Sequence, residues 1–447
     1  MNTTRELVQI QPTNLGTGVF SFKGGVPQIV FDIPMMPKIM NGKSLRIQGT
    51  FTCFTGLAGG AAVPDNQNQT ATRKVWIDAR TGVSSCIDFL SIANQEGATY
   101  EMIKNYNRLC SSLLPLNDSF NDFIAGGVDM IDGATSKNLQ MAKMCDKPFD
   151  FALPLRAGFL QGSPIDLQLV KGLRITIQLA ADGYVMRNNY YTETGDTSGD
   201  SGTYYELSDV LLTFECQVPD PEGQEAMVNN QNGVWDYNAF TSFYSVVQSS
   251  DHNAILNINT SKTIGTIMNM TPSKFLNSHR YNSQLATQFR ATDGLAPPVL
   301  SRQVQMNDLT FTKGGLRIPL DFEISSEDTQ RQQIADSQKN YTELNAIRKI
   351  WSLSNELKGL RTELSLPNAA GVLPKFNTSM NYNDATQVYN IGVSYDHITE
   401  NGLNFKGNPL GIRIQSDLTA GTPHSLFVFV KHKNTIVFKN GQVSVLN

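Results

Sequence analysis

Alternation of apolar and polar residues is the dominant pattern along this chain. It is clearest between residues 149 and 183, where the runs FALPL, IDLQL and LRITIQLA place apolar side chains at alternate positions. Gly158, Gly162 and Gly172 separate these runs and favour turns. Short runs rich in β-branched and aromatic residues continue the pattern in both halves. The predicted strands are residues 28–33, 45–54, 73–78, 151–155, 165–169, 173–180, 204–218, 240–248, 254–270, 305–324, 386–395, 425–432 and 435–438.

Two segments have the spacing of an amphipathic helix instead. In residues 99–114, apolar side chains recur every three or four positions, Met102 among them, which predicts a helix docked on a sheet. Residues 325–351 begin with a Ser-x-x-Asp capping pair and predict a longer inserted helix. The last two strand runs are expected to form a hairpin with a tight turn at Lys433 and Asn434.

The chain is long enough for two domains. A single hydrophobic core stops growing beyond about 250–300 residues, and this chain has 447. Residues 219–233 are polar and contain Gly and Pro, so they are interpreted as a connector. Each half offers about eight strands, the strand count of a jelly roll. We predict an all-β fold of two consecutive eight-stranded jelly-roll β-sandwiches with a few inserted helices: an N-terminal arm (1–15), a first jelly roll (16–225) and a second (226–447).

Composition favours a protein whose surfaces meet other proteins. Charged residues make up 17% of the chain, against about 25% in an average soluble protein. The net charge is −4, so no positive field exists to neutralise phosphates, and we expect no specific nucleic-acid binding. Neither an apolar leader nor a run of eighteen apolar residues occurs, so classical secretion and a membrane span are not expected.

Cysteine usage indicates a reducing compartment. The five cysteines are widely spaced, odd in number and confined to the first half: Cys53, Cys86, Cys110, Cys145 and Cys216. This distribution favours buried thiols over a disulfide framework.

Candidate chemistry is sparse. The sequence contains no HExxH, GxSxG, Walker A, GxGxxG or CxxC motif. Cys110 is interpreted as a core filler, and Asp129 and Asp132 as loop carboxylates. The isolated histidines are His252, His279, His397, His424 and His432. We therefore predict no catalytic residue, no cofactor-binding residue, no metal ligand and no enzymatic activity.

A short phrase recurs, as GLRI at Gly172 and Gly315 and as GIRI at Gly411. Any glycine-started strand with an outward arginine has this form. Alternatively, the phrase marks equivalent strands in two similar β domains, although four residues do not establish a duplication.

The order of the strand runs carries a family resemblance. Residues 75–109 (VWIDARTGVSSCIDFLSIANQEGATYEMIKNYNRL), then FALPLRAGFLQG, GLRITIQLA and YYELSDVLLTFECQ, resemble the first jelly roll of double jelly-roll major capsid proteins. The likeness is strongest to those of polinton-like viruses and virophages, within the adenovirus-type capsid lineage. FYSVVQSS and FVFVKHKNTIVFKNGQVSV extend it into the second half.

The resemblance implies a viral major capsid protein that trimerises into pseudo-hexameric capsomers. These would tile an icosahedral shell around a double-stranded DNA genome, after assembly in the host cytoplasm or nucleus. Expected partners are the homotrimer itself, neighbouring capsomers, a penton or vertex protein and minor capsid proteins, and no cofactor is implied. Residues 1–15 are expected either to reach a neighbouring capsomer or the shell interior, or to be a frayed terminus.

One alternative of a different class remains open at this point. A carbohydrate-binding or glycan-hydrolysing β-sandwich would also account for the aromatic, Asn and Gln content, with Asp or Glu residues lining one concave sheet.

Overall fold

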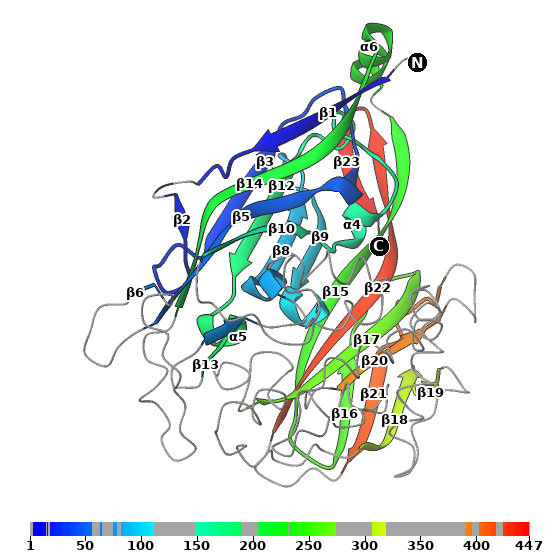
Figure 1. Cartoon of the computed structure of the whole chain (residues 1–447). Coiled ribbons are helices and arrows are strands. Elements are labelled where there is room, and N and C mark those ends of the chain that lie inside the picture. Colours follow the sequence, from blue (N-terminus) through cyan, green and yellow to red (C-terminus); the bar gives the residue numbers. More distant parts are fainter. Residues whose placement is uncertain are drawn as a thin grey trace, which may run out of the picture.

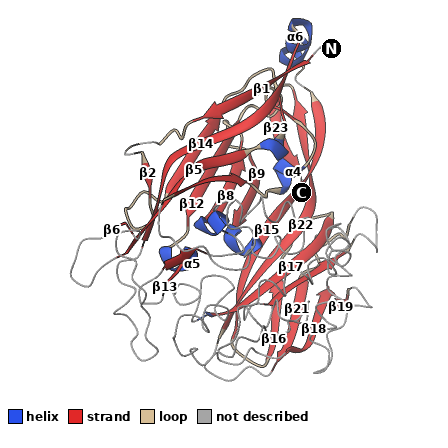
Figure 2. Ribbon diagram, viewed as in Figure 1, coloured by secondary structure: helices blue, strands red, loops and turns tan. Residues whose placement is uncertain are grey.

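The computed structural model consists of two β-rich halves with long strands running between them (Figures 1 and 2). Strands from residues 3–219 build the sheets of the first half, and strands from residues 233–446 build those of the second. The structure describes residues 3–14, 16, 18–55, 63–64, 75–77, 82–110, 148–188, 204–230, 232–273, 306–318, 389–395, 402–416 and 423–446.

The first half encloses its core between two sheets. The larger sheet follows the order β10-β5-β14-β4-β11, with β1 and β2 also on β14 and β6 on β5, and the smaller follows β3-β12-β8-β9. Strand β12 has the expected alternation, with four inward apolar side chains from Leu173 to Leu179. The strands are β1 (Thr3–Ile10), β2 (Val19–Phe20), β3 (Gln28–Ile33), β4 (Ile39–Met40), β5 (Arg46–Thr55), β6 (Val63–Pro64), β8 (Ile87–Ala93), β9 (Thr99–Lys104), β10 (Phe149–Pro154), β11 (Ile165–Asp166), β12 (Leu173–Leu179) and β14 (Tyr204–Pro219); β7 (Val75–Ile77) and β13 (Met186–Asn188) form a separate pair.

The second half also has two sheets. One follows β15-β22-β17-β20 with β23 on β22, and the other follows β16-β21-β18-β19. Its strands are β15 (Gly233–Val247), β16 (Asp251–Leu256), β17 (Thr263–Pro272), β18 (Met306–Lys313), β19 (Leu316–Arg317), β20 (Tyr389–Ser394), β21 (Leu410–Ser416), β22 (His424–Lys439) and β23 (Gln442–Leu446). The strand predictions on described residues overlap strands of the structure, but three predicted runs are not continuous. Residues 165–169 are strand only at Ile165–Asp166, residues 254–270 divide into β16 and β17, and residues 305–324 contain β18 and the separate β19. Strands β1, β8 and β23 were not predicted.

Short helices replace several predicted turns and connectors. Gly158 begins the one-turn helix α4 (Gly158–Gln161) instead of a turn. The predicted connector holds α6 (Pro221–Asn229), with Asp220 capping the Gly223 amide and Pro221 at the first position. The predicted boundary between residues 225 and 226 falls inside this helix. The remaining short helices are η1 (Gly42–Ser44), η2 (Gly82–Cys86) and α5 (Asp182–Val185).

The helix predicted over residues 99–114 is wrong in its first part, because Thr99–Lys104 is strand β9. Helical structure begins only at Tyr106, after Asn105 leaves the strand with φ +54°. The pairing of β8 with β9 shifts register between Ile92 and Ala93, and this bulge buries two successive β9 residues. Met102 is 45% exposed, which contradicts its assignment to a buried stripe.

The turn predicted at Lys433 and Asn434 is also wrong. Both residues lie inside β22, a continuous strand of 16 residues that pairs with β15 along its length. The chain reverses instead at Asn440 and Gly441, both with positive φ, before β23. Asn-Gly supplies the two positive φ angles that a two-residue hairpin turn needs, so this signal was present in the sequence.

The N-terminal segment was expected to be an extended arm or a frayed terminus, but most of it is a strand of the first half. Residues 3–10 form β1, which pairs antiparallel with residues 212–219 of β14 in the same chain. Its side chains are mostly exposed, so backbone hydrogen bonding sets its place. The predicted helix over residues 325–351 lies outside the described residues.

Candidate functional site

The two halves share a wall made by the long strands β15 and β22 (Figure 1). Phe427 and Phe429 on β22 pack into the core of the first half, whereas Leu426, Val428 and Val430 pack into the core of the second. This part of β22 is buried on both faces. A strand that supplies both cores holds the halves in a fixed relation, so the junction is the candidate functional site.

Glu101 is the polar centre of the junction. It lies on β9 of the first half and is almost fully buried. One carboxylate oxygen accepts from the amides of Gly158 (3.1 Å) and Phe240 (2.7 Å), and the other accepts from the Phe159 amide (2.8 Å). Gly158 and Phe159 open α4, and Phe240 lies on β15. A single carboxylate therefore joins three backbone segments, two from the first half and one from the second.

A second polar chain continues from this point across β15 and β22. Tyr237 donates from its hydroxyl to the Tyr100 carbonyl (2.7 Å) and accepts from Nδ2 of Asn434 (3.3 Å). Oδ1 of Asn434 then faces Nδ1 of His432 at 2.7 Å, and Nε2 of His432 lies 2.8 Å from the Thr241 hydroxyl. With the amide in this orientation, Nδ1 of His432 is the donor and Nε2 the acceptor.

Burial decides the charge states in this network. Desolvation raises the pKa of Glu101 to about 7, against the lowering effects of its three amide donors and of Lys431. Desolvation lowers the pKa of His432 to about 4, so its ring is neutral at physiological pH. Burial also raises the pKa of the Tyr100 and Tyr237 hydroxyls, which stay protonated.

Aromatic rings and a close backbone approach complete the junction. Phe159 stacks on Tyr100 with ring centroids 4.9 Å apart and meets Trp235 and Tyr237 edge to face at 5.0 and 5.2 Å. Gly158 lies against the backbone of β15, where a Cβ would overlap the Asn238 carbonyl. The glycine that sequence analysis assigned to a turn is thus needed for contact between the halves.

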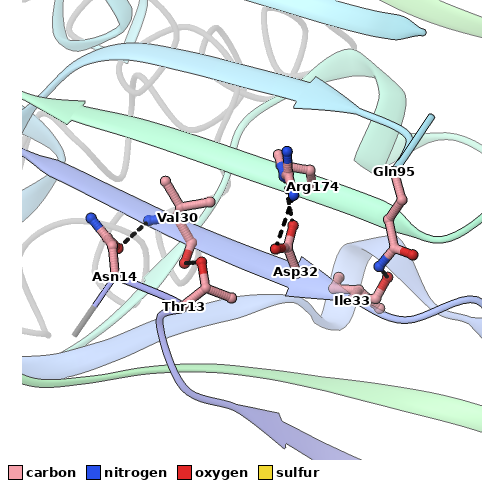
Figure 3. Close-up of polar contacts among 7 residues, drawn as sticks. All are labelled: Thr13, Asn14, Val30, Asp32, Ile33, Gln95 and Arg174. Carbon is pink, nitrogen blue, oxygen red and sulfur yellow. Dashed lines mark hydrogen bonds and ion pairs between the residues drawn. The ribbon is translucent and has the colours of Figure 1, made fainter. Parts of the chain in front are cut away.

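A second polar cluster seals the edge of β3 (Figure 3). The Asn14 side chain donates to the Gln28 carbonyl (2.7 Å) and accepts from the Val30 amide (3.0 Å), as a neighbouring strand would. The Thr13 amide adds a bond to the Val30 carbonyl (2.8 Å). On the other side of β3, Arg174 on β12 pairs with Asp32 (Nε to Oδ1, 2.7 Å). Residues 3–14 therefore contact both sheets of the first half.

The residues weighed as candidate chemistry do not gather. His424 and His432 lie eight positions apart on β22, about 26 Å along a strand, and His252 lies on β16. Over the described residues, no group of three His, Cys, Asp or Glu side chains is placed to hold a metal ion. His279, His397, Asp129 and Asp132 lie outside the described residues.

The cysteines that the structure describes are buried and form no disulfide, as predicted. Cys53, Cys86, Cys110 and Cys216 make up this set, and Cys145 lies outside the described residues. Among the helices in the described part of the chain, none has the length and apolar character to cross a membrane.

Glu101 is not among the candidate residues that the sequence patterns indicate. In a regular strand, Tyr100 and Glu101 would point to opposite faces, and only the β8–β9 bulge turns both inward. A lone glutamate between two apolar residues carries no sequence signal for such a place.

Comparisons with solved structures assign the fold. The chain is similar to the Faustovirus major capsid protein, with a TM-score of 0.59 and 10% identity over 98% of this chain and 91% of that one. It is similar to a chain in the structure of the Sputnik virophage, with a TM-score of 0.57 and 12% identity over 99% and 88%. It is also similar to the mavirus major capsid protein, with a TM-score of 0.50 and 12% identity over 98% of this chain and 89% of that one. The predicted double jelly-roll fold is therefore confirmed. No protein-family model matches the chain, and neither does any curated protein.

Proposed function

We propose that this chain is a viral major capsid protein. The observation that carries the proposal is the extent of the structural likeness, because both halves, in order, match chains from capsids over nearly their whole length. A match confined to one sandwich would fit many unrelated β proteins.

In this proposal, three copies assemble into a capsomer in which six jelly rolls surround a threefold axis. The capsomers tile an icosahedral shell of the virion around a double-stranded DNA genome. A penton or vertex protein and minor capsid proteins are the further partners, and assembly takes place in the host cytoplasm or nucleus. The role is structural, not enzymatic.

The junction supports this role mechanically. A shell subunit has to present two sandwiches to its neighbours at a constant relative angle, since each contact repeats many times. Two features restrict that angle. Strand β22 is buried in both cores, and Glu101 is hydrogen-bonded to both halves. The low charge density also limits repulsion between copies.

The test is the solution mass of the purified chain by light scattering, with negative-stain images of the same sample. We expect a species near three times the 49.3 kDa chain mass, with hexagonal outlines or closed shells. A monomer that persists at high protein concentration would contradict the proposal.

A further inference from the structure

We propose that Glu101 is a proton-sensitive clamp between the two halves, so that the junction opens more readily as the pH rises. The inference concerns the folded subunit and does not depend on assembly into a shell.

The geometry places the carboxylate where opening must change its surroundings. Gly158 and Phe159 approach it from α4, and Phe240 approaches from β15 of the other half. Separating β15 from β9 and α4 breaks the bond to Phe240 and admits water to a group that is 3% exposed when closed. The closed state thus holds a dehydrated carboxyl group, and the open state holds a hydrated one.

When the open state hydrates the carboxyl group of Glu101, its pKa returns to the ordinary value for a glutamate. Burial raises the pKa of Glu101 to about 7 in the closed junction, from the 4.5 of a glutamate in water. A raised pKa means that the closed state binds the proton more tightly than the open state. The contribution to closure is fully present below pH 4.5 and is lost as the pH rises through about 7. The difference between the two values corresponds to at most about 300-fold in the opening equilibrium.

The other groups facing Glu101 do not share this titration. Lys431 on β22 is the nearby cation and lowers the pKa of Glu101. Tyr100 on β9 and Tyr237 on β15 are held protonated by burial. His432 on β22 has a pKa of about 4 and is already neutral above about pH 6. In the closed junction, between about pH 6 and about pH 8.5, Glu101 is the one of these carboxyl, hydroxyl and imidazole groups that changes its protonation state.

Amide hydrogen exchange on the intact wild-type protein tests the clamp directly. Peptides containing Gly158, Phe159 and Phe240 are followed by mass spectrometry between about pH 6 and about pH 8.5, with rates corrected for intrinsic exchange. We expect their protection to fall by up to about 10-fold across this range. Peptides from β12, in the same half but away from the junction, serve as the internal control and keep constant protection.

Two variants separate the clamp from general effects of charge. Glu101→Gln keeps the side-chain shape but cannot titrate, so junction protection is expected to be lower at every pH and independent of pH. Glu96→Gln removes the same charge from the exposed turn of the same β8–β9 hairpin and should retain the wild-type dependence.

Constant protection at the junction in the wild type would overturn the proposal, and this result needs no variant to fold. The proposal would also be wrong if Glu101→Gln kept the wild-type pH dependence. Light scattering at each pH records the oligomeric state, so loss of assembly, which concerns the proposed function, is distinguished from opening within the subunit.

Discussion

The four-stranded sheets of the two halves have the same strand order but different edges. In the order β3-β12-β8-β9 and in β16-β21-β18-β19, the second strand contains the recurring phrase at Gly172 or Gly411. The arginine of each phrase pairs with an aspartate on the first strand: Arg174 with Asp32 at 2.7 Å, and Arg413 with Asp251 at 3.2 Å. The phrases at Gly172 and Gly411 therefore mark strands in equivalent places, whereas the phrase at Gly315 lies at the turn before β19 and marks no such equivalence.

The edges show where this equivalence ends. Thr13 and Asn14 occupy the outer edge of β3, as Figure 3 shows. Among the described strands, none pairs with the outer edge of β16. An open edge is a site for pairing with another chain, so the N-terminal segment protects one sheet, and the structure describes no such protection for the other.

The cores of the halves differ in a second way. The first core includes side chains from β15, β17 and β22, whereas the second core contains only residues from the second half. The first half consequently depends on the second for completion. The two sandwiches have similar topology but are not two independent folding units.

The largest effects are expected where β22 serves both cores. Phe429→Ala removes a buried ring from the first core and should cost about 3–5 kcal/mol, while Leu426→Ala in the second core should cost about 2–5 kcal/mol. Denaturant unfolding measures both costs. If the halves are coupled through this wall, each variant unfolds in a single transition.

Hydrogen exchange assigns each loss to a half. Phe429→Ala should raise local opening in β9, the first-half strand at the junction, and Leu426→Ala should raise it in β21. Ser444→Ala on the exposed face of β23 is the matched control and should change stability by less than about 0.5 kcal/mol. Exchange confined to the second half in Phe429→Ala would mean that the first core does not depend on β22.

The next effect compares the glycines of the recurring phrase. Gly172 has φ +68°, and a Cβ there would lie 2.6 Å from the Ile33 carbonyl oxygen, so Gly172→Ala should cost about 2–4 kcal/mol. Gly411 has no positive φ, and its nearest neighbour is the Thr312 hydroxyl, which can rotate away. Gly411→Ala should therefore cost about 1 kcal/mol or less. Equal losses in thermal unfolding would contradict this distinction.

These contrasts explain how far the sequence could predict the molecule. Alternation located strands such as β12, whose side chains point inward at every second residue, but it did not locate β1, β8 or β23. Alternation gave the wrong structure at β9 and at residues 433–434, where partners in other strands decide the structure. At β9, the partner is β8, and the bulge in their pairing buries Glu101. At residues 433–434, the partner is the Tyr237 hydroxyl, which accepts a hydrogen bond from Asn434. The Tyr237–Asn434 contact joins residues 197 positions apart, and the bulge depends on how β9 pairs with its neighbouring strand, so alternation along the chain encodes neither.

A smaller effect is expected at the sealed edge of β3. Asn14→Ala removes two side-chain hydrogen bonds to β3 at an exposed site and should cost about 1 kcal/mol. Asn14→Asp keeps the acceptor for the Val30 amide but loses the donor to Gln28, so an intermediate cost is expected. Thermal unfolding gives both values. If Asn14→Ala matched the wild type, the edge would be held by Thr13 and β1 alone.

The smallest effects on stability are expected from breaking the two ion pairs, although both sheets have such a pair. All four side chains are substantially exposed, from 25% for Asp32 to 59% for Asp251, so solvent screens both pairs. Double-mutant cycles with Arg174→Ala and Asp32→Ala, and with Arg413→Ala and Asp251→Ala, should give couplings close to experimental error and insensitive to added salt. A clear, salt-dependent coupling in either sheet would contradict this expectation. Negligible couplings in both would mean that the likeness of the two sheets depends on the buried isoleucines of each phrase. Those side chains pack into the cores, whereas the arginines lie on the exposed faces of β12 and β21.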